Sequence, residues 1–211
     1  MHRVAVIDYG MGNLRSVAKA LETVSSNTKV EITADPQQIL SADHIVFPGV
    51  GAMRDCISEL QRLELDDVIH QAVVQKPFLG ICLGMQALLS SSEENDGSQG
   101  LNIIEGQARH FDMAPQYQHL KIPHMGWNEV HQNKAHSLWQ DIKQDSRFYF
   151  VHSYYVSPTD ANVIAATTAY PEPFSSAVQK DNVFAVQFHP EKSQNDGLKL
   201  LENFLNWDGQ S

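Results

Sequence analysis

Cysteine is scarce in this sequence, whose 211 residues include only Cys56 and Cys82 and no Cys-x-x-Cys pair. This scarcity excludes a disulfide scaffold and a cysteine-rich zinc site, and it is typical of proteins in a reducing compartment. No segment approaches the about 18 consecutive apolar residues expected of a membrane span. The first residues also lack an apolar stretch long enough for a signal-peptide core. We therefore expect a cytoplasmic protein.

Basic residues are outnumbered, with 15 Lys and Arg against 25 Asp and Glu and a formal net charge of -10. Such a surface is unsuited to nucleic acid or to an anionic membrane as the main partner. A hydrophobic content of 42% is ordinary for a globular protein. The length suffices for one sizeable core but not for two full domains. We expect residues 1–211 to form a single domain.

The hydrophobic pattern changes character half-way along the chain. In the first half, expected strands alternate with expected helices, the strands over residues 4–7, 44–47 and 77–81 and the helices over 14–24, 65–73 and 83–89. This alternation predicts parallel strands with crossover helices. The second half favours strands over 147–156, 163–168, 174–179 and 183–188, then a helix over 196–207. The polar segment 90–99 is interpreted as a surface loop. The predicted fold is α/β, a parallel sheet extended by mixed or antiparallel strands.

The first candidate for chemistry is Cys82, which lies between Gly80 and Gly84 at the junction of an expected strand and helix. A nucleophile on such a turn needs strained backbone angles, and small neighbours let the chain pass closely on both sides. The amino end of the following helix favours the thiolate. The alternative is a buried structural cysteine at the end of a strand. The glycines on both sides favour the nucleophile.

A second candidate is the pair His189 and Glu191, separated by Pro190 directly after an expected strand. In an extended chain, residues i and i+2 point to the same side, so imidazole and carboxylate can lie together. A thiol nucleophile needs a base, and the base needs an orienting acceptor. The alternative is a surface turn with a solvated His and Glu. Together with Cys82, the pair completes a catalytic set.

A third candidate is the Pro-Gly-Val-Gly segment at residues 48–51, which ends an expected strand. Its glycines permit unusual peptide orientations, so its backbone amides can hold a developing oxyanion. We expect the oxyanion between the N–H of Leu83 and one from Gly49 and Val50. Without the other two candidates, a plain turn is the better interpretation.

Other patterns are rejected. Gly10 and Gly12 follow the first expected strand, but a dinucleotide fingerprint requires glycine where Arg15 stands. The histidine pairs 119 with 124 and 131 with 136 have a spacing that fits neither one helix face nor one strand face, so they are poor metal ligands. We expect neither a metal nor an organic cofactor.

Together these motifs resemble those of the class I glutamine amidotransferases, which use a Cys-His-Glu triad. Four further segments resemble one branch of that family, namely DYGMGNLRSV at 8–17, PHMGWN at 123–128, YFVHSY at 149–154 and VQFHPEKS at 186–193. The resemblance implies a flavodoxin-like three-layer fold and hydrolysis of L-glutamine to glutamate and ammonia. It also implies a heterodimer with a (β/α)₈-barrel cyclase. That cyclase uses the ammonia to make imidazole glycerol phosphate and aminoimidazole carboxamide ribotide in histidine biosynthesis.

The resemblance also implies roles for individual residues. Gln86 and Glu94 should help to hold the glutamine, together with the backbone of His152, Ser153 and Tyr154. Two positions depart from the expected pattern, because Pro171 and Ala185 stand where glycine is usual. Both lie outside the triad and put only local turn geometry in question. The alternatives are a free-standing cysteine hydrolase acting on γ-glutamyl bonds, another class I amidotransferase subunit, and a non-enzymatic interaction module with this fold.

Overall fold

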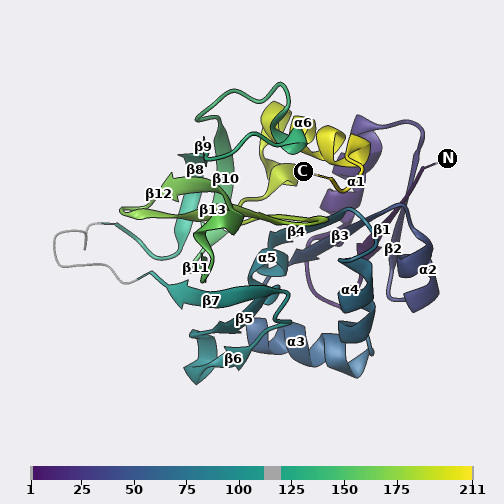
Figure 1. The fold of residues 1–211 in the computed structure, drawn as a ribbon, viewed down its shortest axis with the longest axis horizontal. Coiled ribbons are helices and arrows are strands. Elements are labelled where there is room, and N and C mark those ends of the chain that lie inside the picture. The colour runs from purple at the N-terminus through teal and green to yellow at the C-terminus, as the bar shows by residue number, and fades with distance from the viewer. Residues whose placement is uncertain (1, 112–119, 211) are drawn as a thin grey trace.

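A long mixed sheet forms the frame of the molecule (Figure 1). The computed structural model describes residues 2–111 and 120–210. Within them, one half of the sheet is parallel and has the strand order β2-β1-β3-β4-β14. These strands are β1 (His2–Ile7), β2 (Thr28–Thr33), β3 (His44–Gly49), β4 (Phe78–Cys82) and β14 (Val183–Val186). The predicted parallel sheet is therefore present.

The other half of the sheet continues from β14 and is mainly antiparallel. Its strands are β13 (Pro173–Lys180), β11 (Tyr154–Pro158), β7 (Ile104–His110), β5 (Leu89–Ser92) and β6 (Ser98–Gln99), with β12 (Ile164–Ala169) and β9 (His131–Gln132) paired at the side. A separate antiparallel ribbon pairs β8 (His124–Glu129) with β10 (Arg147–His152). The mixed extension that the sequence predicts is thus confirmed.

Helices cover both faces of the parallel half, as Figure 1 shows. One face carries α1 (Leu14–Val24) and α6 (Gln194–Asn206), and the other carries α3 (Met53–Arg62), α4 (Asp66–Ala72) and α5 (Leu83–Ala87). The short α2 (Pro36–Ser41) packs against α4. Short 3₁₀ turns lie at η1 (Glu94–Asp96), η3 (Ser137–Trp139), η4 (Ala161–Val163) and η5 (Pro190–Lys192). None of the helices in this described part is long and apolar enough to cross a membrane.

Strand β1 shows why three layers form. Its side chains alternate between the faces, so Val4 and Val6 join a core with α1 and α6, whereas Ala5 and Ile7 join a second core with α3 and α4. All four side chains are buried. A strand that is covered on both faces is apolar throughout, and this produces the unbroken hydrophobic run seen in the sequence.

Two sequence predictions need correction. The run over 147–156 is not one strand but two, because β10 pairs with β8 whereas β11 pairs with β7 and β13. Segment 90–99 is not simply a surface loop, since it contains most of β5, all of η1 and β6. Ser92 and Ser98 in this segment are buried, and their hydroxyls bond to the backbone of Glu94. The side-chain hydroxyls satisfy the turn locally, so a polar segment can be ordered.

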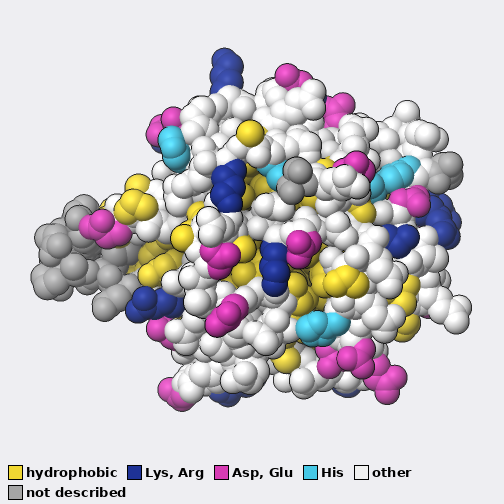
Figure 2. Space-filling model, in the orientation of Figure 1, with side chains coloured by type: hydrophobic (Ala, Val, Ile, Leu, Met, Phe, Trp, Pro, Cys, Tyr) yellow, Lys and Arg dark blue, Asp and Glu magenta, His cyan; other side chains and the backbone are white. Residues whose placement is uncertain are grey.

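The surface carries charges of both signs. On the face seen in Figure 2, acidic and basic side chains are interspersed, and hydrophobic side chains are exposed between them. The large hydrophobic residues that are most exposed in the described chain include Val74, Met125, Val50 and Trp127. Val50 lines the pocket described next, and Met125 and Trp127 lie on β8, directly after the pocket residue Pro123.

Candidate active site

Cys82 lies on a sharp turn between β4 and α5. Its backbone has φ 55° and ψ -110°, a conformation that is rare for any residue other than glycine. A side chain on Gly84 would collide with the carbonyl group of Phe47, so only glycine lets α5 approach β3 this closely. The strand-to-helix turn expected from the sequence is therefore present, and it stores backbone strain at the sulfur-bearing residue.

His189 and Glu191 form a buried pair. Nδ1 of His189 donates to Oε1 of Glu191 over 2.9 Å, and both side chains are almost fully buried. The loop that carries them is tied to β10, because His189 N–H donates to the Tyr149 carbonyl and the Ser193 hydroxyl donates to the His189 carbonyl. The same hydroxyl accepts the Tyr149 N–H. Pro190 and these bonds fix the imidazole in one position.

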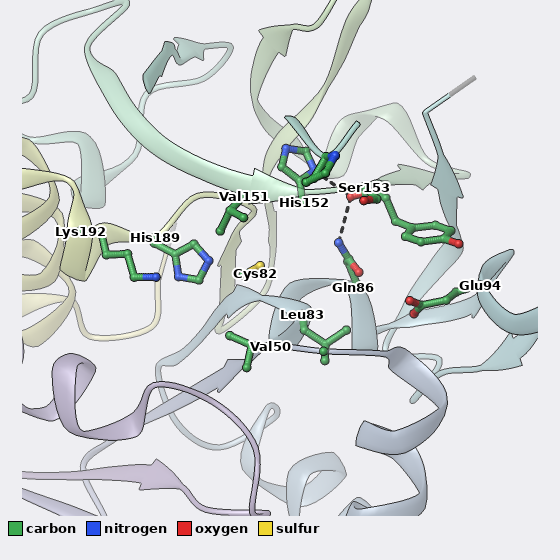
Figure 3. Close-up of a pocket in the computed structure, with 13 residues that line it drawn as sticks. Val50, Cys82, Leu83, Gln86, Glu94, Val151, His152, Ser153, His189 and Lys192 are labelled. Carbon is green, nitrogen blue, oxygen red and sulfur yellow. Dashed lines mark hydrogen bonds between the residues drawn. The ribbon is translucent and has the colours of Figure 1, made fainter. Parts of the chain in front are cut away.

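The electrostatics of His189 favour its protonated form. Burial lowers its pKa, but interactions with Cys82 and Glu191 outweigh burial and raise the pKa to about 10. Figure 3 shows the imidazole beside the sulfur of Cys82. An imidazole placed between a cysteine sulfur and a carboxyl group is the arrangement that a cysteine nucleophile with a general base requires.

These groups open into a pocket of about 310 Å³ (Figure 3). Nine residues expected from the sequence to act at the site line this pocket, namely Val50, Cys82, Leu83, Gln86, Glu94, His152, Ser153, Tyr154 and His189. Gly49 and Glu191 do not line it. Gly49 pairs in register with Cys82 below the pocket, and Glu191 is buried behind His189. The expected site residues therefore converge, from elements far apart in the sequence.

Gln86 and Glu94 are fixed by bonds to the backbone. The Gln86 amide nitrogen donates to the Tyr154 carbonyl over 3.0 Å, which leaves the amide oxygen available to a ligand. One carboxylate oxygen of Glu94 accepts the Met53 N–H over 2.8 Å at the start of α3. Glu94 brings a negative charge to the far end of the pocket from His189 (Figure 3).

Comparison with known proteins gives the family. The family model for class I glutamine amidotransferases matches residues 5–207. The chain belongs to the class I glutamine amidotransferase family. The predicted family resemblance is confirmed, and with it the α/β fold whose parallel sheet is extended by antiparallel strands.

Relatives within this amidotransferase family are similar over their whole length. The imidazole glycerol phosphate synthase subunit HisH of Nitrosococcus oceani is 57% identical, with 100% of both chains covered. The HisH subunit of Acinetobacter baylyi is 58% identical over 99% of this chain and 100% of that protein. A crystal structure of a glutamine amidotransferase has the same fold, with a TM-score of 0.72 at 15% identity over 96% of this chain and 97% of that one. The glutaminase domain of Trypanosoma brucei CTPS, with bound acivicin, has a TM-score of 0.65 at 16% identity, with 100% of this chain and 98% of that one covered.

The amidotransferase site contains residues that sequence reasoning missed. Gln187 is fully buried, and its amide nitrogen lies 3.7 Å from the Cys82 sulfur. Lys192 lines the pocket, and its ammonium lies 5.8 Å from the centroid of the Tyr149 ring. The hydroxyl of buried Tyr9 donates to the Pro48 carbonyl over 3.0 Å. Gln187 could have been found, because it precedes His189 by two residues and so can point to the same side.

The two positions that depart from the usual glycine lie outside the pocket lining. Ala185 is buried in β14 opposite Gly80 of β4, and a side chain on Gly80 would lie 3.0 Å from the Ala185 methyl. Because Gly80 has no side chain, the Ala185 methyl group fits between the two strands. Pro171 lies in the turn between β12 and β13, where the Tyr170 N–H donates to the Glu172 carbonyl.

The histidines considered as metal ligands have other partners. His124 bonds to His152, His131 to Asp145, and the His136 ring accepts the Leu138 N–H. His119 lies outside the described residues. Within residues 2–111 and 120–210, no three His, Cys, Asp or Glu side chains form a group that could hold a metal ion.

Proposed function

We propose that this chain hydrolyses L-glutamine with the triad Cys82, His189 and Glu191 and delivers the ammonia to a synthase partner. The partner is a (β/α)₈-barrel cyclase, which makes imidazole glycerol phosphate and aminoimidazole carboxamide ribotide in histidine biosynthesis. The observation that carries the proposal is the triad at one pocket in a chain that is 57% identical to a HisH subunit over its full length.

The proposed chemistry is acyl transfer in two steps. The Cys82 thiolate attacks the side-chain carbonyl carbon of glutamine, and the His189 imidazolium gives its Nε2 proton to the departing ammonia. His189 then takes a proton from water, which attacks the glutamyl thioester and releases glutamate. Glu191 accepts the hydrogen bond from Nδ1 of His189 in both steps, so the imidazole keeps one orientation.

The remaining pocket residues bind the substrate and its charge. The oxyanion lies between the N–H of Leu83, at the amino end of α5, and a backbone amide from Gly49 and Val50. Glu94 is placed to attract the α-ammonium group of glutamine at the far end of the pocket. Gln86 and the backbone of residues 152–154 hold the rest of the amino acid.

The proposed partner surface combines Val50 at the pocket with exposed side chains of the neighbouring strand β8. Met125 and Trp127 share one side of β8, with 63% and 40% of their surfaces exposed. The Trp127 ring contacts the Tyr149 ring, beside which Lys192 reaches the pocket. Exposed aromatic and methionine side chains are enriched at protein interfaces. A cyclase bound here covers the pocket and receives ammonia without loss to solvent.

The test is Cys82→Ser in the complex with the cyclase. We expect glutamine-dependent synthesis to fall by at least about 10³-fold, because the nucleophile is lost. Synthesis driven by added ammonium should stay unchanged, since acceptor chemistry belongs to the partner. Cys56→Ser is the matched control and should support both reactions. Full glutaminase activity of the chain alone would favour a free-standing hydrolase, and undiminished glutamine-driven synthesis by Cys82→Ser would exclude the proposed nucleophile.

A further inference from the structure

A chain of amide groups ends at the nucleophilic sulfur. Nε2 of Gln187 donates to the Cys82 sulfur over 3.7 Å, and Oε1 of Gln187 accepts from the Gln86 amide over 3.1 Å. The same Gln86 nitrogen donates to the Tyr154 carbonyl over 3.0 Å. Gln187 is fully buried, and Gln86 is nearly so. Bonds of this kind in a buried site are not exchanged for bonds to water.

The direction of each bond follows from the Tyr154 carbonyl. A carbonyl oxygen only accepts, so Gln86 must turn its NH₂ group toward Tyr154. That same NH₂ group then faces Gln187, which must present its oxygen. The NH₂ group of Gln187 is left facing the sulfur. Rotating either amide by 180° would place two acceptors or two donors together, so the orientation at Cys82 is determined.

Two buried histidines hold the Tyr154 carbonyl in place. Nδ1 of His152 donates to this carbonyl over 2.8 Å, so its Nε2 must accept from Nδ1 of His124 over 3.0 Å. Burial lowers the pKa of His152 to about 3 and that of His124 to about 4, so both rings are neutral at pH 7. Neutral rings match the donor and acceptor roles that the bonds require.

We propose that Gln187 is a further catalytic residue, whose side-chain amide donates a hydrogen bond that stabilises the Cys82 thiolate. The inference rests on the proposed glutaminase function. A thiolate accepts an N–H bond far more strongly than a thiol does, so a fixed donor favours the ionised sulfur. The titratable groups that face the sulfur or line its pocket are His189, with Glu191 behind it, Tyr9, His152, Tyr154, Glu94 and Lys192. Gln187 differs from them because an amide does not titrate.

The same bond assists the second chemical step. When water attacks the glutamyl thioester, the water proton passes to His189 and the C–S bond breaks with its electron pair returning to sulfur. The sulfur leaves as a thiolate, and the Gln187 N–H stabilises it by donating a hydrogen bond. Loss of the donor should therefore slow release of glutamate as well as the first attack.

The experiment measures alkylation of Cys82 by iodoacetamide across pH in the full-length chain. Gln187→Glu keeps an oxygen for Gln86 but replaces the donor with a carboxylate oxygen, and Gln187→Met removes the donor with little change in length. We expect alkylation at pH 7 to be about tenfold slower in Gln187→Met, and slower still in Gln187→Glu. The pH at half-maximal rate should rise in both variants.

The control is Gln179→Met, a partly exposed glutamine on β13 whose amide donates to the Asp181 carbonyl. It should alkylate like the parent chain. If Gln187→Met does not fold, Gln187→Glu alone decides. A folded Gln187→Glu with parental rate and pH profile would overturn the inference. The outcome is separate from that of Cys82→Ser, because Cys82 could still be the nucleophile without this donor.

Discussion

The two cysteines differ in burial and in the groups that surround their sulfur atoms. Cys56 is fully buried in α3, and burial raises the pKa of its thiol to about 12, although its hydrogen bond with Tyr9 lowers the pKa slightly. Cys82 lines the pocket and has His189 beside it. The thiolate is the reactive form of cysteine, so the two residues should differ strongly in reactivity.

We predict that iodoacetamide at pH 7 modifies Cys82 in the folded chain and leaves Cys56 unmodified. The physical reason is that Cys56 remains a protonated thiol inside a packed core. Peptide mass spectrometry after a short reaction measures the two sites separately, with the unfolded chain as the control in which both react. Preferential modification of Cys56 in the folded chain would count against the whole assignment.

At the scale of elements, the segment of residues 48–51 is fixed at one end and exposed at the other. The Tyr9 hydroxyl holds the Pro48 carbonyl, and a side chain on Gly49 would collide with that hydroxyl. Val50 is 41% exposed at the pocket rim. The Gly49–Val50 peptide is therefore the first one that can rotate, and glycine makes the rotation feasible.

We predict that the free chain binds glutamine but turns it over slowly, and that the nucleotide-loaded partner rotates this peptide toward the oxyanion. One oxyanion donor typically contributes about 10²–10³ in rate. The partner should accordingly raise kcat more than it lowers KM. Steady-state glutaminase kinetics with and without the partner measure this. A change confined to KM would mean that the partner only improves ground-state binding, and a free chain at the full rate would exclude the switch.

Local patterns in the sequence predict some elements and not others. The helices α1, α4 and α6 carry clear apolar stripes, and the parallel strands are short apolar runs, so both could be predicted. The division between β10 and β11 could not, because strand partners depend on tertiary contacts. β2 was missed because only part of TKVEIT is buried at the sheet edge.

The candidate site also contains residues that local sequence patterns predict and residues that they do not. Cys82, His189 and Glu191 stand in compact motifs, so their residue types and spacing are enough to suggest the chemistry. The amide chain through Gln86 and Gln187 joins residues 101 positions apart, and no local pattern marks it. Tyr9 likewise reaches Pro48 only because β1 and β3 are neighbours in the sheet. Contacts of this kind are set by topology rather than by sequence spacing.

At the scale of the whole molecule, three buried histidines and the partly buried His136 make stability depend on pH. Burial is the main cause that lowers the pKa of all four, to about 4 for His44, His124 and His136 and about 3 for His152. In the unfolded chain the same groups titrate near 6.5. As pH falls below about 6.5, the unfolded state therefore binds protons that the folded state does not accept, and the free energy of unfolding decreases. His189 acts in the opposite sense, because its raised pKa stabilises the fold below about 10.

We predict that the urea midpoint of unfolding falls between pH 7.5 and pH 5.5. Each of the four histidines with a lowered pKa should cost about 1 kcal/mol at pH 5.5, and the raised pKa of His189 offsets about one of these contributions. The net loss of about 3 kcal/mol is a large part of a typical stability. His136→Phe should reduce the dependence of the urea midpoint on pH, because it removes one titrating group. The His136 ring packs against Phe184 and Trp207, so a phenyl ring can take its place, and only the hydrogen bond from the Leu138 N–H is lost. Exposed His131→Gln is the matched control and should leave the dependence unchanged. Equal midpoints at the two pH values in the parent chain would show that the buried rings accept protons without unfolding.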